Sequence, residues 1–298
     1  MQIQGLDVVV EGRLLKTLRL QEEWSDDISD PDAFIAAARA SGVKADLVTF
    51  WQRAPETKPK YHFFTEWEDL AVLPVHSYDE WWNNRIKSRT RGLIRKTEKT
   101  GVTIRETQFD DEFVRGMVEI FNETPVRQGR PFWHYGKNFE TVKREFSRFL
   151  YREDIIGAYH EDKLIGFVML ANAGQNAFLG QIISKIAHRD KAPNNSLVAK
   201  AIEITARKQI PYLVYNYWNE TGLTEFKRRN GFEKLSVPRY FLPLTAKGRL
   251  GLSLGAHRSI ANMLPKALVI RLRQVRAAYY ARKQGVLSEG VATHLDQA

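Results

Sequence analysis

Residues 211–244 read PYLVYNYWNETGLTEFKRRNGFEKLSVPRYFLPL, and this stretch decides the fold. Its first part, 211–217, is rich in aromatic and β-branched residues and predicts a buried strand. Residues 222–230 predict a short helix that Gly231 closes, because glycine readily adopts the conformation in which helices end. Residues 237–244 predict a final strand, so the stretch is a strand–helix–strand step.

The elements upstream of this step extend it into a complete sheet. The predicted order from 102 to 244 is β-α-α-β-β-β-α-β-α-β, an antiparallel meander that continues into a β-α-β step. This order predicts an α/β (α+β) fold with a mixed, mostly antiparallel sheet flanked by helices, and excludes a doubly wound parallel sheet. The strands are expected at 102–106, 155–160, 164–172, 177–186, 211–217 and 237–244, and the helices at 109–121, 138–149, 196–209 and 222–230.

The first hundred residues predict a smaller α/β set. Asp30-Pro31 begins a helix that ends near Gly42, because proline favours the first helical turn. Ser77, followed three residues later by Glu80, forms a capping box. It opens a long helix that ends at Gly101. Strands are expected at 8–10, 14–20, 47–51, 61–66 and 70–75.

Composition excludes several classes of protein. The chain has 298 residues, 43% of them hydrophobic, and no cysteine, so it has no disulfide, thiolate–zinc site or catalytic cysteine. The seven histidines lack metal-ligand spacing, and no metal is expected. The N-terminus lacks the pattern of a secretory signal, and no apolar run reaches 18 residues. We expect a cytoplasmic protein and leave a peripheral membrane association open.

The net charge of +10 is unevenly distributed. Beyond Glu233 the chain has 11 bases and two acids, and residues 264–279 carry an amphipathic stripe. A second basic cluster lies between Arg85 and Lys99. Such clusters suit anionic partners, here tRNA or an anionic membrane surface through 85–99 and 247–283. The alternatives are a solvated helix face at 85–99 and a tail that packs on the protein's own body.

Two segments resemble the GNAT acyltransferase superfamily, and its FemABX-like branch in particular. Residues 89–102, RTRGLIRKTEKTGV, resemble the basic helix of that branch, and residues 222–232, GLTEFKRRNGF, resemble its late Phe-Lys-x-x-x-Gly motif. The resemblance implies a partial GNAT-like unit at 1–101 and a complete acyltransferase domain at 102–245. A basic amphipathic extension, with a C-terminal helix, occupies 246–298.

The resemblance also implies an acyl-donor site at the loop before the helix at 196–209. A helix N-terminus presents free amides and a positive dipole end, which suit a phosphate. The glycines of the usual GNAT pyrophosphate loop are missing, and FemABX-like proteins, whose donor is aminoacyl-tRNA, also lack them. The donor is therefore acyl-CoA (acetyl-CoA) or aminoacyl-tRNA. The expected donor-site residues are Ser184, Lys185, His188, Arg189, Lys191, Asn194, Asn195 and Ser196.

The loop at 124–137 combines three bases, three aromatics and one histidine, a composition that suits a binding loop. The resemblance implies that this loop covers the acceptor side of the cleft. Acyl transfer to an amine needs a base and a hydrogen-bond donor for the oxyanion. The alternative to these functional roles is structural: the candidate tyrosines and the loop at 124–137 would only pack against the rest of the domain. The expected substrate-binding residues are Arg127, Gln128, Arg130, Trp133, Tyr135 and Lys227. The candidate bases are His134, Glu123 and Glu220, and the candidate donors are Tyr215, Asn216 and Tyr217.

The sequence thus favours an N-acyltransferase of GNAT fold that moves an acyl group from acyl-CoA to a small-molecule or peptide amine. A FemABX-like aminoacyl-tRNA-dependent transferase is the first alternative. A non-catalytic GNAT-like binding protein is the second alternative. Two features favour it: the pyrophosphate-loop glycines are missing, and the places where GNAT enzymes usually carry a catalytic base and a tyrosine hold other residues.

Overall fold

The computed structural model describes residues 1–219, 222–258 and, in the tail, 271–272, 274–276 and 278–280. The described residues form two compact units: 1–70 with 234–258, and 71–233 with the described residues of the tail from 271 on. The units therefore divide the chain at 70 and 233, whereas the sequence placed the boundaries at 101 and 245. Most of the stripe predicted at 264–279 lies outside the described residues.

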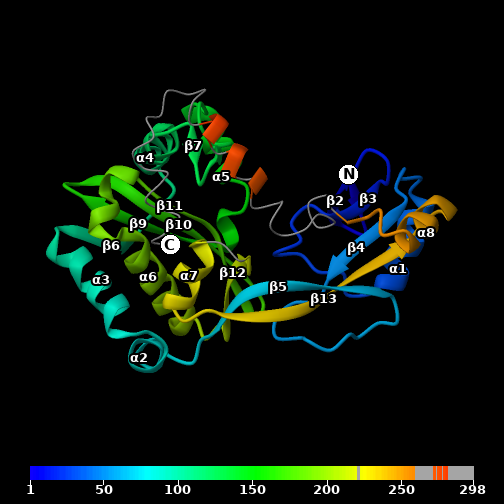
Figure 1. Cartoon of the computed structure of the whole chain (residues 1–298), viewed down its shortest axis with the longest axis horizontal. Helices are drawn as coiled ribbons and strands as arrows, with labels where there is room; N and C mark the ends of the chain where they lie inside the picture. Colours follow the sequence, from blue (N-terminus) through cyan, green and yellow to red (C-terminus); the bar gives the residue numbers. More distant parts are fainter. Residues whose placement is uncertain (220–221, 259–270, 273, 277, 281–298) are drawn as a thin grey trace. The chain divides into compact units, whose positions relative to one another are not determined.

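The first unit is a small sheet with two helices (Figure 1). The side chain of Asp30 accepts a hydrogen bond from the Ala33 amide at 3.0 Å and caps α1, as the Asp30-Pro31 pair predicted. Phe34 of α1 is fully buried in the core of this unit. The elements are β1 (Gln2–Ile3), β2 (Leu6–Glu11), β3 (Thr17–Leu20), α1 (Pro31–Ala40), β4 (Leu47–Trp51), the first part of β5 (Phe64–Pro74), β13 (Glu233–Pro243) and α8 (Ala246–Ser253).

The second unit contains a mixed sheet in the order β5-β12-β11-β10-β9-β6. The pairs β6–β9, β9–β10 and β10–β11 are antiparallel, and β11–β12 is parallel. This is the predicted meander followed by a β-α-β step, so the predicted fold class is confirmed. The strands are β6 (Val102–Glu106), β9 (Glu153–His160), β10 (Lys163–Ala173), β11 (Asn176–Ser184) and β12 (Tyr212–Tyr217).

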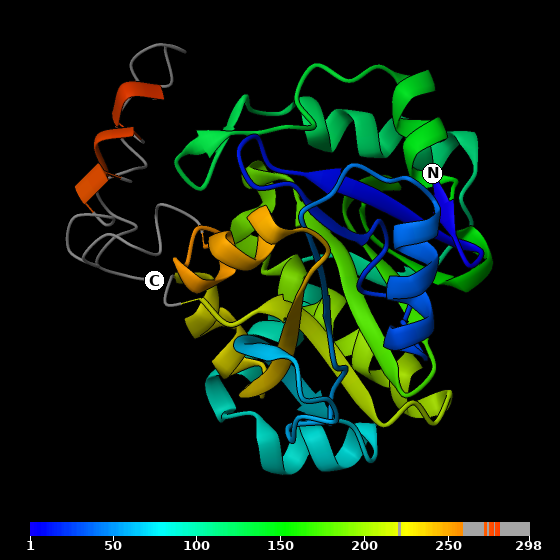
Figure 2. The ribbon, with the colours of Figure 1, turned by 90° about the vertical axis from the view of Figure 1, so that its right-hand side faces the viewer.

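Helices cover both faces of this sheet (Figure 1, Figure 2). Phe167 and Met169 of β10 pack toward α4 (Asp111–Asn122) and α5 (Phe139–Phe146). Val168 and Leu170 point to the opposite face, toward the core that contains α6 (Pro193–Arg207). The alternation of strand side chains thus places two helical layers on one buried strand.

The long helix predicted at 77–101 is broken. Its parts are α2 (Tyr78–Glu80), a π-helical turn (Trp81–Arg85) and α3 (Ser88–Lys99), and Ile86 between them is extended. The fully buried Trp81 donates its indole N–H to the Asn230 carbonyl at 2.9 Å. Arg91 of α3 donates to the carbonyls of Trp82 and Ile86, which the break leaves free. Tertiary bonds therefore override the local preference for one continuous helix.

Three other segments differ in detail from the sequence predictions. Strands expected at 61–66 and 70–75 form one strand, β5. The loop at 124–137 contains a small hairpin, β7 (Val126–Arg127) and β8 (Arg130–Pro131). A 3₁₀ helix, Ile186–Lys191, overlaps the first part of the loop expected at 188–195. A further 3₁₀ turn, Leu150–Arg152, precedes β9, and α7 (Gly222–Arg229) follows β12. In the parts of the chain that the structure describes, no helix could cross a membrane.

Candidate active site

The parallel strands β11 and β12 separate after a short shared ladder. Asn176 to Phe178 pair with Tyr212 to Val214, and the pairing stops there although both strands continue. In the β10–β11 pairing, Gly180 of β11 is an extra, unpaired residue, and this bulge bends β11 near the point where its pairing with β12 stops. Residues 179–184 and 215–217 thus diverge, and such an opening between parallel strands is where α/β sheets hold ligands.

A buried lysine lies on the β12 side of this opening. Lys227 of α7 is 2% exposed, and its ammonium donates to the Tyr217 carbonyl at 2.7 Å. The same nitrogen lies 4.7 Å from the centre of the Tyr215 ring. Among the described residues, no carboxylate pairs with it. Burial lowers the pKa of Lys227 to about 8.

The backbone beside Lys227 has an unusual conformation. Asn216 has φ +51°, in the left-handed region that asparagine tolerates better than most residues. Tyr215 is buried against Phe226 and Phe232, and burial raises the pKa of its hydroxyl. The structure places the three predicted oxyanion donors on the diverging end of β12, although their catalytic roles stay predictions.

The helix α7 turns Lys227 inward because its polar residues divide between two faces. Thr224 and Lys227 are buried, whereas Glu225 forms exposed ion pairs with Arg228 and Arg229. Gly231, with φ +88°, ends the helix, and a Cβ there would lie 3.2 Å from the Trp81 side chain. The glycine of the quoted motif is therefore needed for backbone conformation and for space.

The start of α6 contacts Asn230, the residue that follows α7. Asn195 donates to the side-chain oxygen of the fully buried Asn230 at 3.4 Å. The side-chain oxygens of Asn194 and Ser196 are buried without a hydrogen-bond partner in the described part of the chain. Thr97 of α3 donates to the carbonyls of Lys191 and Ala192 and fixes the loop before α6. Polar groups thus gather where the resemblance placed the donor site.

The amides of this loop are already partly used. His188, Ala192 and Asn195 donate to carbonyls three residues earlier, as a 3₁₀ turn requires. Pro193 has no amide hydrogen. The helix start therefore offers fewer free amides to a pyrophosphate than a glycine-rich loop would.

The predicted donor-site cations differ in their availability. Lys185 pairs with Glu119 at 2.7 Å, and Lys191 lies 3.6 Å from Asp190. Arg189 is exposed and has no ion pair within the described residues. The ring of His188 lies 5.4 Å from that of His160, and burial and nearby cationic charge lower the pKa of His188. Ser184 is buried at the end of β11.

Glu123 and Arg127 bind the backbone at and just after the C-terminal end of β11. Glu123 accepts hydrogen bonds from the amides of Ile186 and Ala187 at 2.6 and 2.9 Å. Arg127 pairs with Glu123 at 2.9 Å and donates to the Ser184 carbonyl at 2.9 Å. This contact network gives both residues a structural task beside the opening, and their roles as base and substrate ligand stay predictions.

We expect E123A to destabilise the fold by about 2–4 kcal/mol, because it leaves a part-buried arginine and two amides without their partner. Urea unfolding measures the loss. E112A, at an exposed carboxylate of α4, is the matched control. A loss below about 1 kcal/mol would refute the structural task.

His134 is buried under the hairpin. Its ring stacks on Phe121 at 4.4 Å, and its Nε2 accepts from the Trp133 indole at 2.7 Å. Burial and the charge of Lys137 lower the pKa of His134 to about 4. The imidazole is therefore neutral at pH 7 and already hydrogen-bonded, and its role as a base stays a prediction.

We expect the stability of the wild type to fall as the pH drops from 6.5 to 4. Over this range the unfolded chain takes up a proton at residue 134 that the folded chain does not, which costs on the order of 3 kcal/mol. H134F keeps the stacked shape and removes the proton site. Urea unfolding at pH 7 and pH 4 should show a smaller loss for H134F, and equal losses would contradict the buried, neutral histidine.

The remaining predicted acceptor residues lie on the surface of the hairpin and the segment after it. Gln128 and Gly129 form its left-handed turn, and Arg130 is exposed. Trp133 and Tyr135 are 73% and 48% exposed. These positions give them access to a substrate, and their binding roles stay predictions. The candidate base Glu220 lies outside the described residues.

Sequence reasoning missed two residues of the site, Thr224 and Asn230. Both are polar, both are buried, and the Thr224 hydroxyl has no partner in the described structure. The available signal was their spacing with Lys227, since positions 224 and 227 share one face of a helix. No group of three metal-binding side chains occurs among the described residues.

Comparisons with known proteins bear on the fold. No protein-family model matches the chain, and no curated protein matches it. Many solved structures do match it. Among them are a FemX (12% identity, TM-score 0.53, covering 83% of this chain and 85% of that one), a putative lysylphosphatidylglycerol synthetase C-terminal domain from Agrobacterium fabrum (13%, 0.55, 83% and 83%) and L-PGS from Bacillus licheniformis (13%, 0.55, 91% and 86%). The chain therefore has the GNAT-like, FemABX-type fold that the sequence predicted.

Proposed function

We propose that this protein transfers an aminoacyl group from aminoacyl-tRNA to an amine or hydroxyl acceptor. The observation that carries the proposal is Lys227, a buried ammonium that contacts the diverging end of β12 and has no carboxylate partner among the described residues. Acyl transfer develops negative charge on the carbonyl oxygen, and a fixed cation in a water-poor site stabilises that charge strongly. The names of the three structural relatives, which include aminoacyl-lipid synthetases, support the same class of reaction.

The choice of donor rests on charge. The basic cluster at 85–99 divides in the structure: Arg85 pairs with Glu80 and Glu233, and Arg91 binds backbone carbonyls. The others are exposed and lack a carboxylate partner in the described structure. We call them the basic face of α3: Lys87, Arg89, Arg95, Lys96 and Lys99.

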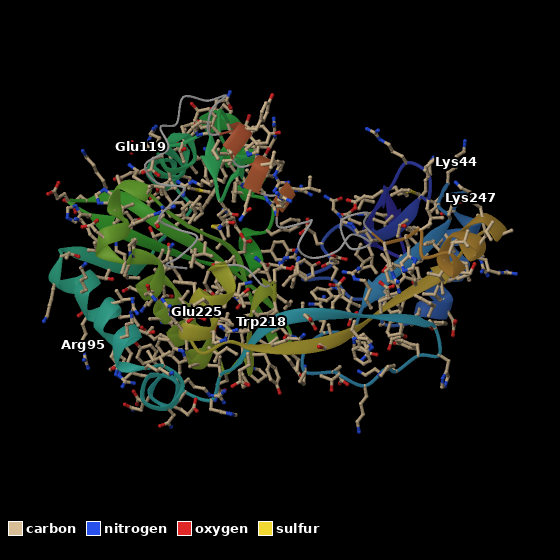
Figure 3. All side chains as sticks on the ribbon, in the orientation of Figure 1. Lys44, Arg95, Glu119, Trp218, Glu225 and Lys247 are labelled. Carbon is tan, nitrogen blue, oxygen red and sulfur yellow. The ribbon has the colours of Figure 1, made fainter. Side chains whose placement is uncertain are left out.

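The basic face of α3 suits a phosphate backbone. Arg95, Lys96 and Lys99 lie on neighbouring turns, and Figure 3 shows Arg95 extending outward from the helix. Gly92, at the centre of this face, has nothing within 4 Å of an added Cβ, so a partner can approach the helix closely. Arg95 also lies over the Trp82 ring, 5.5 Å from its centre. A cluster of exposed cations on one helix face is the usual electrostatic footprint of nucleic-acid binding.

Acyl-CoA is the second candidate donor. The start of α6 and exposed Arg189 favour it, because a helix N-terminus with a nearby cation suits a pyrophosphate. The 3₁₀ turn and Pro193 reduce the free amides there, and we therefore place aminoacyl-tRNA first.

A label-transfer experiment distinguishes the donors. The protein is incubated with tRNA charged with a mixture of ¹⁴C-amino acids, or with ¹⁴C-acetyl-CoA, and with lipid, peptide and small-molecule extracts as acceptors. We expect label to leave the tRNA and to enter one acceptor fraction. Label transfer from acetyl-CoA alone, lost in R189E/K191E, would establish the second candidate. Transfer from neither donor would contradict the proposal.

A further inference from the structure

A groove is lined by residues of α3, β6 and α6, the three elements labelled in Figure 1. Its volume is about 440 Å³, within the range of small-molecule sites. Ile94 of α3, Val102 and Ile104 of β6, and Ala199 of α6 line it with apolar side chains. The groove therefore suits an aliphatic chain.

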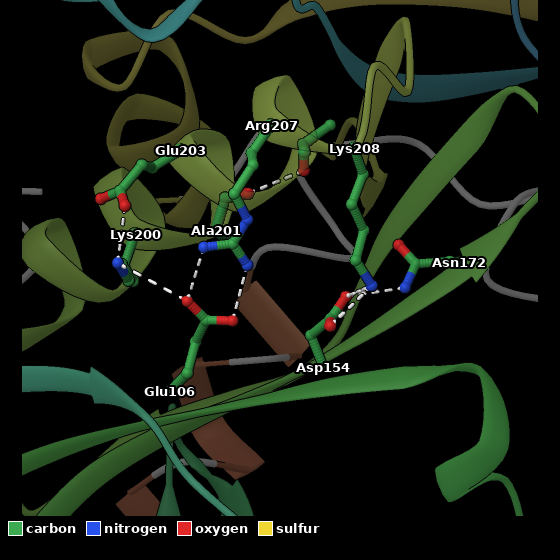
Figure 4. A network of polar contacts seen from close by, with 9 residues as sticks. Glu106, Asp154, Asn172, Lys200, Ala201, Glu203, Arg207 and Lys208 are labelled. Atoms are coloured by element: carbon green, nitrogen blue, oxygen red, sulfur yellow. Dashed lines mark hydrogen bonds and ion pairs between the residues drawn. The ribbon is translucent and has the colours of Figure 1, made fainter.

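The polar lining of the groove is acidic. Glu98 of α3 and Glu203 of α6 line it together with Lys200. Lys200 lies 2.6 Å from Glu203 and 3.7 Å from Glu106, and Arg207 pairs with Glu106 at 2.7 Å (Figure 4). Two cations thus balance two carboxylates.

Glu98 is a further carboxylate of the lining, and no cation pairs with it among the described residues. It is exposed and lies one helical turn after Arg95. The groove therefore carries an excess negative charge on a chain whose net charge is +10.

Two neutral residues, Tyr78 and Ser196, complete the lining. Burial and the charges of Glu203 and Glu98 raise the pKa of Tyr78. Ser196 is 6% exposed, and its hydroxyl has no hydrogen-bond partner in the described structure. It lies on the same face of α6 as Ala199, Lys200 and Glu203, at helical spacing, and therefore lines the groove with them.

We propose that this groove binds a primary alkylammonium group. A primary ammonium has three hydrogens to donate, and the lining offers the Glu98 and Glu203 carboxylates with the Tyr78 hydroxyl oxygen as acceptors. The alkyl chain covers the apolar lining of α3, β6 and α6. The groove shares Ser196 with the start of α6, and its lining does not include Lys227 of α7, on which the proposed transfer reaction depends.

Calorimetry with n-hexylamine at pH 7.5 tests the site on the full-length protein. We expect binding to the wild type, at least tenfold weaker binding to E98Q/E203Q, and no binding of neutral 1-hexanol. E112Q/E140Q, which removes two exposed carboxylates of α4 and α5, is the matched control and should bind as the wild type does. T103K adds an ammonium at an exposed lining residue and should also weaken binding.

Absence of hexylamine binding, or equal binding to the wild type and E98Q/E203Q, would overturn the site. A lysine-containing alanine pentapeptide with blocked ends separates two sources of the same group. Tighter binding of the peptide than of hexylamine would identify a lysine side chain of a polypeptide as the ligand, and weaker binding a free amine.

Discussion

K227M is expected to lose at least 100-fold in the rate of aminoacyl transfer. Removing one preorganised donor to an oxyanion typically costs 10²–10³ in kcat, and Lys227 combines a full charge with near-complete burial. The measurement is label transfer from aminoacyl-tRNA under single-turnover conditions. K163M, at an exposed lysine of β10, should keep the wild-type rate.

The same substitution is expected to stabilise the protein. The pKa of Lys227 is about 8 in the folded chain and near 10.5 in the unfolded chain, so below pH 8 the folded state holds a charge that burial disfavours. Removing this charge raises the free energy of unfolding by on the order of 3 kcal/mol at pH 7, reduced by the loss of the hydrogen bond to the Tyr217 carbonyl. The wild type should recover this difference as the pH rises from 8 to 10.5. A K227M variant that is both inactive and less stable at pH 7 would indicate a structural lysine.

R89Q/R95Q/K96Q is expected to weaken tRNA binding about 100-fold at 0.1 M salt, because each phosphate contact releases a condensed counterion. The slope of log affinity against log salt should fall by about 2. Filter binding across a salt series measures both quantities. K44Q/K58Q/K163Q removes the same charge from exposed positions elsewhere and should change neither by more than a small amount. Equal losses in both triple variants would show that only the net charge matters.

Most of the fold could be predicted from the sequence, because hydrophobic periodicity and turn residues determine it locally. The apolar run at 164–172 is β10, buried on both faces, and Asp30 caps α1 as expected. The break at Ile86 could not be predicted, since it depends on Trp81 reaching the Asn230 carbonyl, 149 residues away. The division into units at 70 and 233 depends in the same way on contacts distant in sequence.

The candidate site was predicted less completely. The motif around Lys227 marked a binding residue, and the structure places it at the opening between β11 and β12. The unusual composition of the loop at 124–137 predicted that Arg127 binds a substrate. In the structure Arg127 pairs with Glu123 and donates to the Ser184 carbonyl. A charge motif shows that a residue has a partner and leaves open whether that partner is a ligand or the protein itself.

The most direct test of the central claim is the rate of aminoacyl-tRNA consumption between pH 6 and 10, measured in single turnover and corrected for spontaneous ester hydrolysis. If protonated Lys227 stabilises the transition state, the wild-type rate falls above pH 8, as its ammonium loses a proton, and K227M stays low throughout. A corrected rate that is equal in both proteins at every pH would contradict the account.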